Sequence, residues 1–172
     1  MAGKLIQVAT ETITTPTASF NIGGIDDDSV YMLAISNANV ASQNNDIFMR
    51  VGTSSSADTS NNYDYASKNL YTGGFINNNA TNESYWSNVF INMQSTLGNG
   101  NAIIYLYNFY NSSEYSFVTF DNVHLYTGGT HIYGVQGGGI HTVASSQTDV
   151  YLGYGGNITS GTFTLYKVVW YE

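Results

Sequence analysis

The amino-acid sequence predicts an all-β fold, namely a two-sheet antiparallel β-sandwich of the jelly-roll type. No stretch of about 10–12 residues carries apolar side chains at helical spacing, whereas several short runs alternate β-branched or aromatic residues with polar ones. Clusters of Gly and Asn separate these runs, and such residues suit the tight turns between antiparallel strands. Many short strands with regular turns are typical of sandwiches and jelly rolls.

The individual strands are predicted from these runs. In Thr162–Val168, β-branched and aromatic residues dominate and the preference for helix is low. Asn101–Phe109 is apolar on both faces, which is typical of a strand at the centre of a sandwich. In chain order the predicted strands are Leu5–Thr14, Val30–Ser36, Ile47–Val51, Trp86–Met93, Asn101–Phe109, Tyr115–His124, Val150–Tyr154 and Thr162–Val168.

Turns and loops are predicted between these strands. The only proline, Pro16, follows the first strand, where it leaves the ladder intact. Ser54–Asn82 is poor in aliphatic residues, so we expect long loops around one or two short strands there. No change of composition marks a second domain, and residues 1–172 are expected to form one. The turn clusters are Gly23–Asp28, Asn44–Asp46, Gly98–Asn101, Gly128–Gly129 and Gly155–Asn157.

Composition and charge exclude several classes of partner. The chain has no cysteine, and its four basic residues are scattered against a net charge of −8, so nucleic acid is not expected to bind. No run approaches the roughly 20 apolar residues of a membrane span, and the N-terminus lacks the pattern of a signal peptide. We therefore expect synthesis in a host cytoplasm, and no membrane partner.

Two groups of residues could in principle bind a metal. His124, His131 and His141 could converge in a sheet, and the acidic run Asp26–Asp28 could ligate calcium. Neither group has the spacing of a dedicated site, so we expect hydrogen-bonded histidines, a solvated acidic turn, and no metal or cofactor. No nucleophile elbow, phosphate loop or carboxylate pair is indicated, and the chain is predicted not to be an enzyme.

Aromatic residues are the one enriched chemical feature. The chain contains 15 tyrosines, 8 phenylalanines and 2 tryptophans, and exposed Tyr and Trp mark protein interfaces and sugar-binding surfaces alike. Tyr85 and Trp86 lie next to the loop-rich segment, and Trp170 lies near the C-terminus. These three residues are a candidate interface or glycan platform, although Trp86 could instead fill the core and Trp170 could pack in the core or against another subunit.

Parts of the sequence resemble small β-rich virion proteins of marine tailed phages, cyanophages especially. The resemblance rests on Met1–Glu11, on Gly156–Tyr166, and on the Asn-rich aromatic strand Tyr105–Asn111 with the Phe-rich strand and Gly-rich loop that follow it, together roughly a third of the chain. It implies a protein on the virion surface, foremost a capsid decoration or knob protein that binds the shell. The alternatives are a tail fibre or receptor-binding protein that recognises a host glycan, and a carbohydrate-binding module.

Low charge favours assembly with other protein copies. Only 9% of the residues are charged, whereas about 25% is usual, and Asn, Ser, Thr, Gly and Tyr replace them. These residues lose less than Lys or Glu would when an interface removes their water. We therefore expect a homo-oligomer, or a chain that binds a repeating surface of other virion proteins. Lys4 and Lys167 lie close to the two ends and could pair with acidic groups of a neighbouring subunit, at about 0–1 kcal/mol for each pair.

Overall fold

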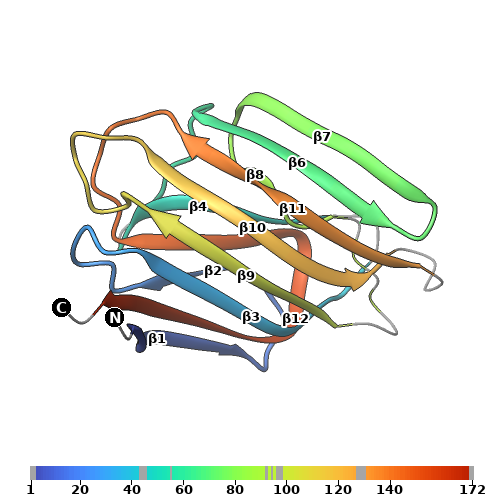
Figure 1. Ribbon diagram of the computed structural model, residues 1–172. Coiled ribbons are helices and arrows are strands. Elements are labelled where there is room, and N and C mark those ends of the chain that lie inside the picture. The colour runs from blue at the N-terminus through green and yellow to red at the C-terminus, as the bar shows by residue number, and fades with distance from the viewer. Residues whose placement is uncertain are drawn as a thin grey trace.

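All regular structure in the computed structural model is antiparallel β-strand (Figure 1). The model describes residues 3–42, 46–54, 56–91, 93, 95, 99–126 and 131–170, and within them no helix occurs, hence none long and apolar enough to cross a membrane. The all-β antiparallel prediction is confirmed. The strands are β1 (Gly3–Ile13), β2 (Thr17–Gly23), β3 (Tyr31–Val40), β4 (Ile47–Thr53), β5 (Ser56–Ala57), β6 (Tyr63–Tyr71), β7 (Gly74–Glu83), β8 (Trp86–Phe90), β9 (Gly100–Tyr107), β10 (Ser116–Leu125), β11 (Ile132–His141) and β12 (Asp149–Trp170).

The strands form one continuous, curled sheet. Its order is β5-β4-β12-β3-β9-β10-β11-β6-β7, with β1 and β2 paired to β12 and β8 paired to β4. Two separate sheets are therefore not seen, and the jelly-roll sandwich is not confirmed. The reason lies in the long strand β12, whose two halves belong to different parts of the sheet.

Strand β12 turns a corner in the sheet. Its first part, Asp149–Tyr154, pairs with β2 and β4, and its last part, from Thr162 on, pairs with β1 and β3. Register shifts lie between these parts, and such bulges bend a strand sharply. Figure 1 shows β12 turning at the right-hand side and running back beside β1. Gly161 follows the bend with φ of 140°, and a Cβ there would lie 2.9 Å from the Cα of Ala38. The corner thus requires glycine.

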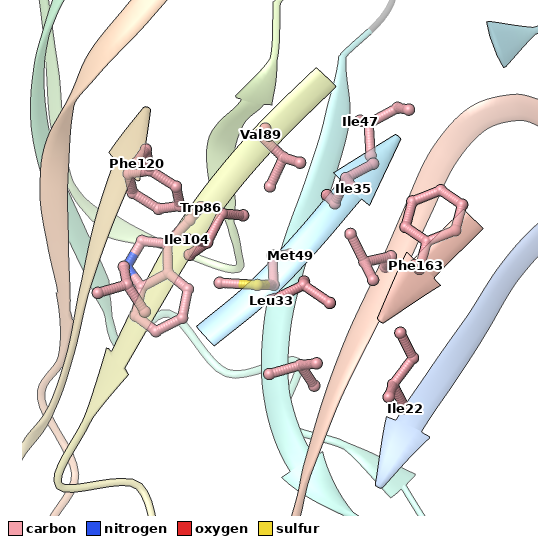
Figure 2. Packing of buried hydrophobic residues seen from close by; sticks show 14 of the residues in the cluster. Ile22, Leu33, Ile35, Ile47, Met49, Trp86, Val89, Ile104, Phe120 and Phe163 are labelled. Atoms are coloured by element: carbon pink, nitrogen blue, oxygen red, sulfur yellow. The ribbon is translucent and has the colours of Figure 1, made fainter. Parts of the chain in front are cut away.

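The core lies where the curled sheet faces itself. Side chains from β3, β9 and β10 meet side chains from β4, β8 and β12, and Figure 2 shows Trp86 and Phe120 at one end of this packing and Phe163 and Ile22 at the other. Trp86 is fully buried, and its indole N–H donates to the carbonyl oxygens of Asp64 (3.2 Å) and Ile140 (3.3 Å). The satisfied N–H removes the cost of burying the one polar group of this side chain.

The predicted strands overlap strands of the structure, with Val150–Tyr154 and Thr162–Val168 joined in β12. The prediction of long loops in Ser54–Asn82 is wrong. Strands β6 and β7 form a hairpin there, joined by the turn residues Thr72 and Gly73 between the paired Tyr71 and Gly74. Strand β7 is an edge strand, so ladder hydrogen bonds hold it and its side chains need not be apolar. Strands β2 and β11 were also not predicted.

The predicted turns are only partly covered by the described residues. Gly23–Asp28 connects β2 and β3 as expected, whereas Gly155–Asn157 lies inside β12, at its bend. Asn44–Asn45, Gly98 and Gly128–Gly129 lie outside the described residues.

Candidate functional site

The predicted aromatic platform is not assembled, because its three residues lie on different sides of the sheet. Trp86 begins β8 and points into the core, where it is 0% exposed. Tyr85 precedes it, and successive residues of an extended chain point to opposite faces. Trp170 is 65% exposed and pairs with Gly3 in the last part of β12, whereas Tyr85 stacks on Phe48 of β4, which pairs with the first part of β12. Trp86 is therefore a core residue and cannot be part of a surface platform.

Tyr85 belongs to a compact aromatic cluster on the outside of β4. Its ring stacks on Phe48 with centroids 4.6 Å apart. The Arg50 guanidinium lies over both rings, 4.8 Å from Phe48 and 5.4 Å from Tyr85, and its Nε–H donates to the carbonyl oxygen of Ser84 at 2.8 Å. Phe48 in turn covers Gly153, where a Cβ would come within 2.4 Å of the ring. These contacts fix Tyr85 within the fold.

The three histidines do not converge. His131 bonds Thr72 at 2.9 Å, His141 bonds the Asp58 carboxylate at 2.8 Å, and His124 bonds the Ile91 carbonyl oxygen at 2.7 Å. Among the residues that the structure describes, no three His, Cys, Asp or Glu side chains are arranged to hold a metal ion.

The acidic turn is compensated from within the chain. Lys167 donates to Asp26 at 3.3 Å and also to Asp27, and the buried Tyr31 hydroxyl donates to Asp26 at 2.8 Å. The hydrogen bonds from Tyr31 and Lys167 lower the pKa of Asp26. Burial opposes ionisation of Asp27, but the hydrogen bonds from Lys167 and Ser29, with the charge of Lys167, together outweigh it and lower the pKa of Asp27 to about 2. Lys167, for which a partner in a neighbouring subunit was one possibility, thus has acidic partners within its own chain.

Removing metal is expected to leave the stability unchanged, because Lys167 supplies the positive charge that a calcium ion would bring to this turn. The measurement is the melting temperature with and without EDTA. A fall of more than about 5 °C, roughly 2 kcal/mol for a chain of this size, would contradict this account.

A large uncharged surface lies on the face of the sheet that points away from the core. In β12 and β3, residues such as Phe163 and Leu33 enter the core, so the alternate residues face outward. Over the described residues of β1, β3, β9 and the last part of β12 (from Thr162 on), none of the outward side chains is charged. We call this surface the uncharged face. It consists of Leu5, Gln7, Thr10, Thr12, Thr162, Thr164, Tyr166, Val168, Trp170, Met32, Ala34, Ser36, Asn101, Ile103, Tyr105 and Tyr107.

The same side of the sheet is hollowed over β10, β11, β6 and β7. One hollow of about 610 Å³ has Tyr107 and Phe117 on one side and Asn79 on the other. A second, of about 470 Å³, adjoins it through Ala66 and Asn79 and is lined by amide and charged side chains. We call the two together the cross-strand groove. The volume of each hollow falls within the range of about 300–1,000 Å³ that is usual for ligand-binding pockets.

One signal in the sequence could have revealed both surfaces. Asn101–Phe109 is apolar on both faces, a pattern that predicts a strand at the centre of a sandwich. In the structure, Ile104 and Leu106 face the core, whereas Ile103 and Tyr105 are 45% and 38% exposed. The second apolar face therefore marks a surface that the chain itself leaves open.

Comparison with known proteins adds little to this description. No protein-family model matches the chain, and no curated protein matches it. The solved structure of infectious bursal disease virus, Gx strain, is 11% identical and aligns with 97% of this chain and 39% of that chain, at a TM-score of 0.14. At this TM-score the likeness carries no argument, so function must be argued from the residues.

Proposed function

We propose that the chain is a non-catalytic structural protein of the exterior of a tailed-phage particle, which docks through its uncharged face onto a repeated protein surface. The observation that carries the proposal is the absence of charge from the outward side chains of β1, β3, β9 and the last part of β12, from Thr162 on. Burying Leu5, at 49% exposure, and Trp170, at 65%, would remove apolar area from water without removing water from any charge.

The fold supports this role by holding the face rigid. Behind the uncharged face, Phe163, Leu165 and Ile104 anchor its strands in the core. A surface of fixed strands loses little conformational entropy on binding, so more of the interface energy stabilises the complex. We propose that the folded sheet serves as a jelly-roll-like block, of which one broad side contacts the shell and copies of the same chain.

Copy number in purified particles tests the proposal. For a decoration or knob protein, quantitative mass spectrometry should find hundreds of copies per particle. A handful of copies would favour the tail-fibre alternative, and absence from particles would refute the virion role. In a map of the particle, the largest interface should involve the uncharged face and bury more than about 800 Å² in total, the upper range of crystal contacts.

Introducing a charge into the uncharged face should release the protein from its particle. Leu5 lies in the edge strand β1 and is 49% exposed; Ile76 lies in the edge strand β7, is 46% exposed and points to the opposite face. Leu5→Asp is expected to weaken binding by roughly 2–5 kcal/mol, because a buried unpaired carboxylate is costly. Ile76→Asp is the matched control and should bind normally. Co-sedimentation with particles measures both, and equal retention of the two variants would contradict the proposed docking face.

A further inference from the structure

We infer that the cross-strand groove binds a short, neutral oligosaccharide. The groove adjoins the uncharged face at Tyr107 of β9 and otherwise lies on β10, β11, β6 and β7, outside the proposed docking face, so this binding activity goes beyond the docking role. It is argued from three parallel rows of outward side chains that cross β9, β10, β11, β6 and β7.

The floor of the groove is a row of small side chains. Thr119 pairs with Gly138, Gly138 with Ala66, and Ala66 with Asn79, so the row crosses β10, β11, β6 and β7. At a strand spacing of about 4.8 Å, it is about 14 Å long. Gly138 has no side chain to rise above the floor. A larger residue is disfavoured there, since its Cβ would lie 3.0 Å from the Val118 carbonyl oxygen. A ligand can therefore lie flat along the row.

The row on one side of the floor is apolar and aromatic. Tyr107 pairs with Phe117, Phe117 with Ile140, and Ile140 with Asp64. Phe117 is 42% exposed, and both rings line the larger hollow. Such rings offer an apolar surface to the C–H face of a sugar ring, and the Tyr107 hydroxyl adds a polar group.

The row on the other side is polar. Asp121 pairs with Gln136, Gln136 with Lys68, and Lys68 with Asn77. Amide side chains donate and accept hydrogen bonds at once, which suits hydroxyl groups that do the same. At the far end of the aromatic row, Asp64 accepts a hydrogen bond from the backbone N–H of Asn82 at 2.8 Å, which fixes this carboxylate at the groove.

These rows select the chemistry of the ligand. A purely apolar occupant would take water from the polar atoms of Asp64, Asn79 and Gln136 and offer them no new hydrogen bonds, at a cost for each group. A phosphate-rich ligand would meet Asp64 and Asp121 against the single cation Lys68. A carbohydrate has both an apolar ring face and hydroxyl groups around its edge, and it therefore matches both sides of the groove.

The test uses an array of neutral bacterial and plant oligosaccharides, followed by calorimetric titration of the strongest binder. Tyr107→Ala and Phe117→Ala should each weaken binding by about fivefold or more, as expected for the loss of one stacked ring. Ala66→Leu should abolish binding by filling the floor of the groove. Tyr105→Ala is the matched control, because Tyr105 lies on the same face of β9 but does not line the groove. Melting temperatures verify that each variant is folded.

Binding that survives Tyr105→Ala and is lost on Tyr107→Ala and Ala66→Leu would support the inference. An array without any bound sugar would overturn it, as would capture of an apolar peptide by the groove or equal loss in the Tyr105 and Tyr107 variants. Leu5→Asp should leave sugar binding unchanged, so failure of the inferred glycan site and failure of the proposed docking role can be told apart.

Discussion

Replacing Trp86 by alanine is expected to destabilise the protein by about 3–5 kcal/mol, the usual cost of removing a fully buried large aromatic side chain. Trp86 packs edge-on against Tyr63, with centroids 5.0 Å apart, and against Phe120 at 6.4 Å. Its truncation would leave a cavity between β8 and the strands that cover it, and would remove the donor to the carbonyl oxygens of Asp64 and Ile140. Urea denaturation measures the change in the free energy of unfolding.

The second tryptophan provides the control. Trp170→Ala removes the same side chain from a position that is 65% exposed, so the isolated protein should change in stability by no more than about 0.5 kcal/mol. Comparable losses in the two variants would show that Trp86 is not the core residue described. Gly139→Ala tests the same packing from the other side, since its Cβ would lie 2.5 Å from the indole Nε1. It should destabilise the wild type more than a Trp86→Phe background.

Acidification is expected to destabilise the protein between about pH 6.5 and pH 4 through His124. This side chain is buried, and desolvation lowers its pKa from 6.5 to about 4. Its Nε2–H donates to the Ile91 carbonyl oxygen, and no donor among the described residues reaches Nδ1. In that pH range the unfolded chain binds a proton that the folded chain does not, so the free energy of unfolding falls as the pH falls.

The expected loss is roughly 3 kcal/mol over the whole window, from a difference of about 2.5 pKa units. A His124→Gln variant should lack this pH dependence, whatever its stability at neutral pH. The paired carboxylates act in a lower window, because Asp27 has a pKa of about 2 and loses its stabilising contribution only below its ordinary value of 3.8. Urea denaturation at pH 7, 5.5 and 4 measures the free energy of unfolding at each pH. If His124→Gln lost stability with falling pH as steeply as the wild type, His124 would not be the group responsible.

Strands that carry alternating apolar residues could be predicted from the sequence, and those that do not could not. Strand β10 alternates between buried and exposed positions over its whole length, and Val118–Asp121 predicts this from sequence, whereas further along Asn122 and His124 are buried and Val123 is exposed. Strand β7 consists largely of Asn, Thr and Gly, and only its pairing with β6 makes it a strand. In β11, the three consecutive glycines Gly137–Gly139 are typical of a loop. In the structure they lie in a strand, and Gly139 must be glycine because Trp86 packs against it. Such requirements arise from residues distant in the chain.

The candidate site was harder to predict than the fold. Alternation within a strand could have separated Tyr85 from Trp86, since neighbouring residues point to opposite faces. The cross-strand groove, by contrast, depends on the register that places Gly138 beside Ala66 and Phe117 beside Tyr107. The partners of His124 and His141 are likewise distant in the sequence. Which residues of two distant strands pair with each other depends on the assembled sheet, and this register cannot be deduced from a single sequence.

The corner strand β12 also determines when the chain can fold. It is the last strand, and it supplies ladder partners to β1, β2, β3 and β4, with Gly3 opposite Trp170. During synthesis the first four strands emerge from the ribosome long before β12, so the edges that pair with it stay unpaired until β12 has been synthesised. Contacts of such long sequence separation slow folding into the millisecond-to-second range. The growing chain therefore exposes these pairing edges until β12 emerges, the period in which a chaperone protects best against aggregation.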